Sequence, residues 1–187
     1  MTDKQIIFNI SASSYSMYKT SPLQFYYSYV IKAKADTIPY ACYGLAGTIV
    51  HNILEDVING TVTTDYETVF NKKWESKNLD NLTGFRGNKL KKPVYLESLE
   101  YGIQLIKRIY NKGIVAEEKI QMPFYFDEKV IIGLKGYIDA VATDKNGDIN
   151  IIDWKTNSSV SDFSVHAKMY FLLYLKKHKV LPTKAIY

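Results

Sequence analysis

Two aspartates and a lysine, Asp139, Asp153 and Lys155, stand in the β-rich part of the sequence and are the residue types that a metal-assisted centre uses. Carboxylates directly opposite one another on neighbouring strands repel and destabilise the strand pair. A hard divalent cation such as Mg²⁺ offsets that repulsion, because it binds oxygen ligands and commonly takes one or two carboxylates. The plainer interpretation is a solvated face with an ordinary Asp–Lys ion pair. Against it, an aspartate within the apolar run 136–142 is costly unless it is used.

The turn between the two aspartates decides whether they meet. Residues 144–148 read Asp-Lys-Asn-Gly-Asp, which is typical of a type I turn with Gly147 in the left-handed conformation, giving a three-residue loop and a bulge. In that register Asp139 lies opposite Asp153, and Lys155 shares their face because side chains alternate along a strand. The other, apolar face then carries Ile138, Ala140, Ile152 and Trp154. A two-residue loop would shift the register by one and put Asp139 opposite Trp154.

The elements that position these residues follow from capping residues and apolar periodicity. Ser11-Ala12-Ser13-Ser14 predicts the start of a helix through Tyr18, and Pro22 predicts the start of a second helix. Longer helices are expected over residues 41–58, 65–76, 95–112 and 161–178, and strands over 120–126, 129–143, 149–155 and 184–187. Asp127-Glu128 is expected to turn the chain between the first two strands. This order predicts an α/β or α+β fold with one central sheet.

Length and composition bound the architecture. With 187 residues, 47% apolar and 23% charged, the chain is long enough for a single domain with a real core. We expect a helical part at about residues 10–112, and the sheet with its following helix at about 116–187. The net charge of +5 is compatible with a polyanionic partner. Cys42 is the single cysteine, which excludes an internal disulfide, a thiolate zinc site and a four-cysteine iron–sulfur cluster.

Targeting signals are not visible in the sequence. The N-terminus is polar, and no apolar run approaches the length of a membrane span. We therefore expect a soluble, cytoplasmic protein with no membrane partner. The sequence stops at Tyr187, inside the last expected strand, which leaves room for a further segment.

Four motifs occur in order along the chain. They are Ser11–Ser14 with Tyr18, Ser21-Pro22 and Phe25-Tyr26-Tyr27; Gly47-Thr48-Ile49-Val50-His51 with Glu55 one turn later; Gly136-Tyr137-Ile138-Asp139; and Ile151-Ile152-Asp153-Trp154-Lys155-Thr156. Together they resemble the PD-(D/E)XK nuclease superfamily in its RecB-like form, which includes CRISPR-associated and viral members. The first resembles the opening segment of that group, the second its G-x-x-x-H motif, and the last two its catalytic signature. The resemblance spans about residues 10 to 175.

This resemblance implies a restriction-endonuclease-like core, with a central mixed sheet flanked by helices, and phosphodiester hydrolysis with Mg²⁺ or Mn²⁺. Asp139, Asp153, the backbone carbonyl of Trp154 and His51 would be metal ligands. Lys155 would orient or activate the attacking water and stabilise charge on the phosphate. A bound metal lowers the pKa of its water and neutralises developing negative charge, which agrees with these roles. The alternative for His51 is a helix histidine satisfied by a hydrogen bond in the core.

The chain departs from the family pattern in two places. The fourth motif of the group, Q-x-x-x-Y, falls on Lys168 and Leu172, and neither residue matches it. His166 with Tyr170, or Tyr170 with Tyr174, has the right spacing to substitute, although a tyrosine stripe on a helix is more often core.

The second departure concerns the iron–sulfur cluster of many relatives. One of its four cysteines would precede Pro22, where this chain has Ser21. With Cys42 alone, we expect no iron–sulfur cluster.

The substrate is expected to be DNA, as single strands or ends. A basic loop can contact phosphates through Arg86, Lys89, Lys91 and Lys92, or it is simply a solvated loop. Aromatic side chains near the N-terminus can stack unpaired bases, or they pack in the core; these are Tyr18, Phe25, Tyr26 and Tyr27. No recognition-helix or zinc-finger motif is found, so we expect cleavage without sequence preference.

A nuclease of this kind fits viral or microbial replication, recombination or repair, and a homo-oligomer is compatible with it. Two alternatives stay open: an endonuclease that recognises DNA structure or single strands, and a non-catalytic DNA-binding subunit with a nuclease fold.

Overall fold

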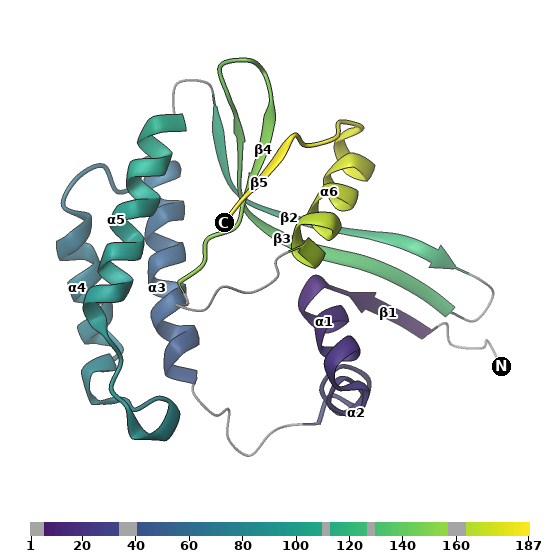
Figure 1. Ribbon diagram of the computed structural model, residues 1–187, viewed down its shortest axis with the longest axis horizontal. Helices are drawn as coiled ribbons and strands as arrows, with labels where there is room; N and C mark the ends of the chain where they lie inside the picture. The colour runs from purple at the N-terminus through teal and green to yellow at the C-terminus, as the bar shows by residue number, and fades with distance from the viewer. Residues whose placement is uncertain (1–5, 34–40, 110–112, 127–129, 157–163) are drawn as a thin grey trace.

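The chain folds around a five-stranded mixed sheet flanked by helices, as the computed structural model shows (Figure 1). The structure describes residues 6–33, 41–109, 113–126, 130–156 and 164–187. The helices are α1 (Ala12–Thr20), α2 (Pro22–Phe25), the π-helix η1 (Tyr26–Ile31), α3 (Ala41–Ile58), α4 (Tyr66–Ser76), the 3₁₀ turns η2 (Leu79–Asn81) and η3 (Phe85–Gly87), α5 (Lys92–Ile109) and α6 (Ser164–His178). The strands are β1 (Ile6–Ile10), β2 (Ile114–Phe126), β3 (Val130–Thr143), β4 (Ile149–Ile152) and β5 (Lys184–Ile186).

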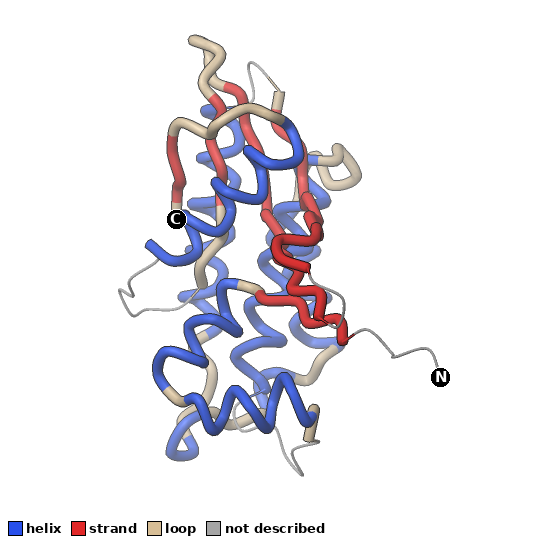
Figure 2. Tube along the Cα trace, turned by 90° about the vertical axis from the view of Figure 1, so that its right-hand side faces the viewer, coloured by secondary structure: helices blue, strands red, loops and turns tan. Residues whose placement is uncertain are grey.

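The helices form two groups. Helices α3, α4 and α5 stand on one side of the sheet, and α6, α1 and α2 stand on the other (Figure 1). After a quarter turn, the strands run through the middle of the molecule between helices (Figure 2). Among the described helices, none is long and apolar enough to cross a membrane.

The central strand is β3. On one edge, β2 pairs with it antiparallel along most of its length, from Ile114 opposite Ala142 to Phe126 opposite Ile131. On the other edge, β3 pairs first in parallel with β1, as far as Leu134, and then antiparallel with β4, from Ala140 onward. Within the described chain, residues 135–139 of β3 therefore have no neighbouring strand on that edge. The sheet is completed by β5, which pairs in parallel with β4.

Two hydrophobic cores meet at the middle of β3. The larger core joins α3, α4 and α5 to the sheet and includes Ala140 and Ile152, and the smaller core lies under α6 and includes Ile138. Since Ile138 and Ala140 are two residues apart on one strand, they would face the same side of a regular sheet. In this strand, however, Ile138 faces α6 and Ala140 faces the α3–α5 core. The pairing with β2 is interrupted at the same place, at Glu117, whose φ is 28°.

Polar contacts fix the outer elements to these cores. The indole Nε1 of the fully buried Trp74 on α4 donates a hydrogen bond of 2.9 Å to Asp80. Glu118 on β2 lies 2.8 Å from Lys177 Nζ and 2.5 Å from His178 Nε2 on α6. Burial raises the pKa of Glu118, but the hydrogen bonds and charges of these two partners outweigh it and hold the pKa below its usual value.

The predicted fold class is confirmed, and most predicted helices are present. Ser11 caps α1 in a reciprocal capping box with Ser14, as its sequence indicated. Helix α5 begins at Lys92 rather than at residue 95, because Pro93 is accommodated in its first turn. Strand β2 begins six residues before its predicted start at 120, and β4 ends at Ile152 rather than at 155. Strand β1 was not predicted.

Some predictions fall outside the described residues. They are the turn at Asp127-Glu128, the end of the helix expected over 95–112, and the start of the helix expected over 161–178.

Candidate active site

The β3–β4 turn has the predicted geometry. Gly147 is left-handed, with φ 87°, and its N–H donates to the Asp144 carbonyl at 3.0 Å, while the Asp144 N–H donates to the Asp148 carbonyl at 3.0 Å. The register that follows places Ala140 opposite Ile152. Asp139 and Asp153 are the next residues in that register, just beyond the last pair of the ladder, so the three-residue loop and its alignment are confirmed.

The predicted composition of the two hairpin faces is wrong in one respect. Ile138, Ala140, Ile152 and Trp154 are all buried, but Ile138 belongs to the α6 core, and the other three belong to the α3–α5 core. A simple alternation of faces therefore does not extend through Asp139. The change of face puts this residue at the boundary between the cores, where it reaches both α3 and the chain after β4.

Asp139 is held from two directions. Its Oδ2 accepts a hydrogen bond of 2.7 Å from the backbone N–H of Trp154, and its Oδ1 lies 3.3 Å from His51 Nδ1 on α3. The first contact ties the end of β3 to the chain after β4, and the second ties β3 to a helix of the other layer. One carboxylate thus joins three segments that are far apart in the sequence.

A glycine on α3 makes this approach possible. A Cβ atom built on Gly47 would lie 2.9 Å from the Thr156 Oγ1, which is closer than real Cβ contacts. His51 follows Gly47 by four residues, so it lies one turn further along the same face of the helix. The G-x-x-x-H spacing therefore has a physical reason here: the glycine admits the chain after β4, and the histidine contacts the carboxylate beside it.

Asp153 and Lys155 form the second half of the site. Asp153 is 4% exposed, and its Oδ2 lies 2.5 Å from Lys155 Nζ. The pKa of Asp153 is raised to about 6, mainly by burial and also by the nearby Asp139, although the ammonium of Lys155 lowers it. Asp139 is thus close enough to oppose the ionisation of Asp153.

The histidine responds to the same charges in the opposite sense. Burial lowers the pKa of His51, but its hydrogen bond to Asp139 and the charges of Asp139 and Asp153 outweigh burial, so the pKa lies above its usual value.

The donor chemistry of the site fits a hard divalent cation. The closely placed, partly desolvated carboxylates of Asp139 and Asp153 are oxygen donors whose mutual repulsion a cation would relieve. Within the described part of the chain, no three side chains of His, Cys, Asp or Glu meet in an arrangement that holds a metal by themselves. Mg²⁺ commonly keeps several waters and takes only one or two protein carboxylates, so a pair is a sufficient protein contribution.

The predicted residues of α6 separate into two pairs. Tyr170 is buried, and its pKa is raised by burial and by the charges of Asp153 and Asp139. The His166 pKa is lowered by burial and by the charge of Lys155. Tyr174 instead packs on His178, with ring centroids 4.3 Å apart, and Lys168 is exposed. The structure brings the 166 and 170 positions to the site and not the other two.

Close packing of α6 on β3 brings Tyr170 to the site. A Cβ atom on Gly136 would lie 2.6 Å from Leu173 Cδ1 and 3.1 Å from a ring carbon of Tyr170. The absence of a side chain at Gly136 therefore lets the buried Tyr170 ring lie against the strand, three residues before Asp139.

The basic loop lies apart from the carboxylates. Its Thr83–Lys89 bridge and Gly84 pack against Tyr43 and Cys42, near the start of α3. From Tyr43 to His51 the helix rises roughly 12 Å, at 1.5 Å per residue. Arg86, Lys89 and Lys91 are exposed, and Lys92 Nζ lies 6.0 Å from the Trp74 ring centre.

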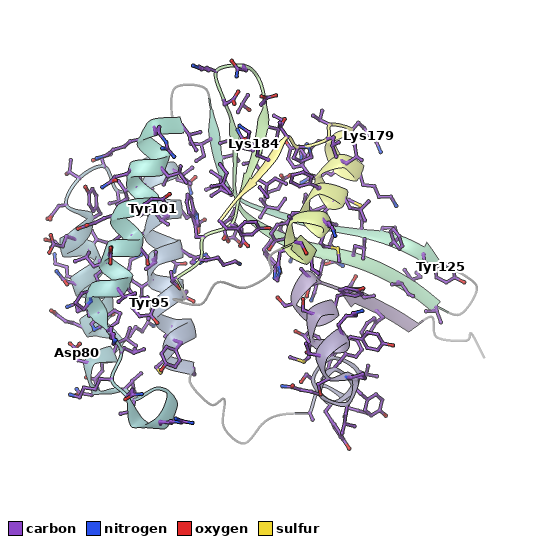
Figure 3. All side chains as sticks on the ribbon, viewed as in Figure 1. Asp80, Tyr95, Tyr101, Tyr125, Lys179 and Lys184 are labelled. Atoms are coloured by element: carbon purple, nitrogen blue, oxygen red, sulfur yellow. The ribbon has the colours of Figure 1, made fainter. Side chains whose placement is uncertain are left out.

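Sequence reasoning missed one neighbour of the site. Burial and the charge of Asp153 raise the pKa of Tyr187 to about 12. This residue also lines a pocket of about 340 Å³ between α3, α5 and the chain after β4, together with Lys155 and Tyr101. The contact arises from the parallel pairing of β5 with β4, and no local sequence signal predicts that pairing. Tyr101 projects from α5 (Figure 3).

Comparison with protein families gives one result that covers nearly the whole chain. The family model described as the PD-(D/E)XK nuclease superfamily matches residues 9–187. Comparison with curated proteins gave no significant match.

Proposed function

Since the chain belongs to the PD-(D/E)XK nuclease superfamily, we propose that it is a Mg²⁺- or Mn²⁺-dependent nuclease that hydrolyses DNA phosphodiester bonds. The observation that carries this proposal is the convergence of Asp139, Asp153, Lys155 and His51 at the junction of β3, β4 and α3. We propose single strands or DNA ends as the substrate, cut without sequence preference. The net charge of +5 and the exposed basic loop support a polyanionic substrate.

In this proposal Asp139, Asp153 and the carbonyl of Trp154 would hold the metal, and the neutral ring of His51 would be a further ligand. When bound, the metal supplies a Lewis acid and a water of lowered pKa. The hydrogen bond from the Trp154 N–H fixes one oxygen of Asp139, so that this carboxylate is oriented before substrate arrives.

Lys155 has two tasks in the reaction. Its ammonium lies against Asp153, within the same cluster of charges, where it can bind a phosphate oxygen and orient the attacking water. Attack of that water on phosphorus forms one P–O bond and breaks another; the water gives up a proton, and the departing oxygen takes one up. Stabilising the extra negative charge of this transition state is the contribution we assign to Lys155.

The biological setting that fits this activity is replication, recombination or repair in the cytoplasm of a microbe or of a virus-infected cell. The mode of attack, from ends or within strands, depends on how DNA reaches the site. The same metal centre serves both modes.

A cleavage assay tests the proposal. End-labelled single-stranded, duplex and circular DNA are incubated with Mg²⁺, Mn²⁺ or EDTA. We expect cleavage by the wild type with either metal, none with EDTA, and loss of about 10²-fold or more in Asp139→Ala and Lys155→Ala. Asp65→Asn is the matched control, because Asp65 is exposed at the start of α4 and its left-handed backbone suits asparagine.

Three outcomes would redirect the proposal. DNA binding without cleavage under any metal would favour a non-catalytic DNA-binding subunit. Full activity in Asp139→Ala would mean that the centre lies elsewhere. Cleavage of circular single strands would identify an endonuclease.

A further inference from the structure

The N-terminal helices carry an unusual amount of exposed apolar surface. Neither α2 nor η1 has a buried residue. On α1, α2 and η1, seven large apolar side chains are between 40% and 68% exposed; we call them the aromatic surface, and they are Tyr15, Tyr18, Leu23, Tyr26, Tyr27, Val30 and Ile31. Exposed apolar side chains gathered on neighbouring helices are often part of a binding site.

Part of this surface is held rigid from below. The Phe25 ring lies 5.7 Å from Phe8, 5.4 Å from Tyr18 and 5.5 Å from Tyr29, measured between ring centroids. Phe25 therefore anchors the helices to β1 and supports one edge of Tyr18, whose other parts are solvent-exposed. The π-helix η1 adds Tyr26 and Tyr27, whose rings are also in contact, 5.7 Å apart. A ring whose orientation is already fixed loses little conformational entropy when a flat ligand stacks on it.

The charge around the aromatic surface has one sign. Between residues 6 and 33 the sequence contains Lys19 and Lys32 and no aspartate or glutamate. Lys19 lies in the last turn of α1, and Lys32 ends η1, so a cation follows each group of rings. Exposed rings with cations beside them complement a strand of nucleic acid, whose bases stack and whose phosphates are anionic.

The aromatic surface also has a connection to the candidate active site. Helix α1 packs against α6. In its second turn, α6 carries Tyr170, whose ring lies against Gly136 of β3, three residues before Asp139. The aromatic surface and the carboxylates are thus separated by one helix.

We propose that the aromatic surface binds single-stranded DNA by stacking unpaired bases on Tyr18, Tyr26 and Tyr27, with Lys19 and Lys32 contacting the backbone. This inference rests on the proposed function for its substrate and adds the part of the protein that selects unpaired strands. A duplex, whose bases are already stacked on one another, offers these rings nothing to stack against.

Binding is measured in EDTA, so that cleavage does not interfere. The probes are a fluorescein-labelled 20-nucleotide oligothymidine and a 20-unit oligomer of abasic sites, which has the same phosphates and no bases. The variants are the triple changes to alanine and to leucine at Tyr18, Tyr26 and Tyr27. Tyr125→Ala is the matched control, because Tyr125 is 52% exposed on β2 and belongs neither to the aromatic surface nor to the pocket beside Lys155 (Figure 3).

We expect the alanine variant to lose about tenfold or more in affinity for oligothymidine, since stacking is worth about fivefold or more for each base and three rings are removed. Its affinity for the abasic oligomer should be unchanged, and the leucine variant should behave like the alanine variant. Lys19→Gln with Lys32→Gln should reduce the slope of log K against log salt by about 1.4, at about 0.7 for each phosphate contact. This second variant leaves the rings intact, so it tests the surface even where the triple variants fold poorly.

Several results would overturn the inference. They are an equal loss on both oligomers, a leucine variant that binds like the wild type, and an unchanged salt slope. Sedimentation that shows a dimer lost in the triple variant, with DNA affinity retained, would assign the surface to a second copy of the chain. This inference and the proposed function fail separately, because binding is measured in EDTA and cleavage is measured with Mg²⁺ or Mn²⁺. Binding without cleavage in the wild type would leave the surface standing and remove the nuclease.

Discussion

Two glycines of α3 provide a matched test of how the site is assembled. Gly44 and Gly47 are one turn apart on the same helix, and Gly44 has no atom within 4 Å of the position that a Cβ would occupy. At Gly47 that atom would lie 2.9 Å from Thr156 Oγ1, where ordinary contact begins at 3.4 Å. Both changes to alanine bring the same gain in helix propensity, about 1 kcal/mol. They differ in what the new methyl group meets.

The size of the difference follows from the distances. Gly44→Ala should raise the free energy of unfolding by about 1 kcal/mol, and hence the melting temperature by about 2–4 °C for a domain of this size. In Gly47→Ala the chain after β4 must move by roughly 0.5 Å, which costs about 1–3 kcal/mol and cancels or exceeds the gain. Since a displacement of 1 Å at a catalytic group can cost about 10²-fold, we expect activity to fall roughly tenfold as Lys155 moves with Thr156.

The assays are urea or thermal unfolding and cleavage of end-labelled single-stranded DNA with Mg²⁺. The decisive variant is Gly47→Ala combined with Thr156→Ala, which removes the oxygen that the methyl group meets and should restore both stability and activity. Equal stabilisation and full activity in Gly44→Ala and Gly47→Ala would refute the close approach. So would a double variant that is no better than Gly47→Ala alone.

Three further predictions concern charges and hydrogen bonds. Glu118→Gln should lower the free energy of unfolding by about 0.5–1 kcal/mol at pH 7. Because the folded pKa of Glu118 is lowered, its stabilising effect is present above the unfolded pKa and disappears as the pH falls through the folded pKa. Urea unfolding of both proteins at pH 7 and pH 4 would detect this change. Asp80→Ala should cost about 1–3 kcal/mol, because it leaves the buried indole N–H of Trp74 without its acceptor, whereas an intact melting temperature would show that water replaces the carboxylate. With the pKa of Asp153 at about 6 in the metal-free protein, calorimetric Mg²⁺ affinity should weaken as the pH is lowered from 7.5 to 5.5, and a pH-independent affinity would exclude this carboxylate as a ligand.

The parts of the site that the sequence predicts well are those governed by local backbone chemistry. The left-handed Gly147 sets a three-residue loop, and the loop alone aligns Asp139 with Asp153 across the hairpin. The G-x-x-x-H spacing similarly places Gly47 and His51 on one face of a helix. Each of these inferences needs only residues that are near one another in the chain.

The features of the site that the sequence did not predict depend on packing between distant segments. The change of face between Ile138 and Ala140 depends on two cores that are built from helices on opposite sides of the sheet. Strand β1 consists mostly of isoleucine and phenylalanine, which favour strands, but so short a segment does not specify its parallel pairing with the open edge of β3. Tyr187 lies near Asp153 because β5 pairs with β4, and no turn or capping residue in the sequence predicts that pairing.

The electrostatics of the site connect metal binding to protons. Without a metal, the charges of Asp139 and Asp153 are balanced by Lys155 and by a histidine whose pKa is raised. The same oxygens and the His51 ring are the proposed ligands, and a histidine coordinates metals only in its neutral form. A proton on His51 and a metal on this ligand set therefore exclude one another. Lys155 must also release Asp153 before that carboxylate can coordinate, and the release frees its ammonium to meet a phosphate. The cations that balance the two carboxylates without a metal are therefore the groups that metal and substrate binding would redeploy.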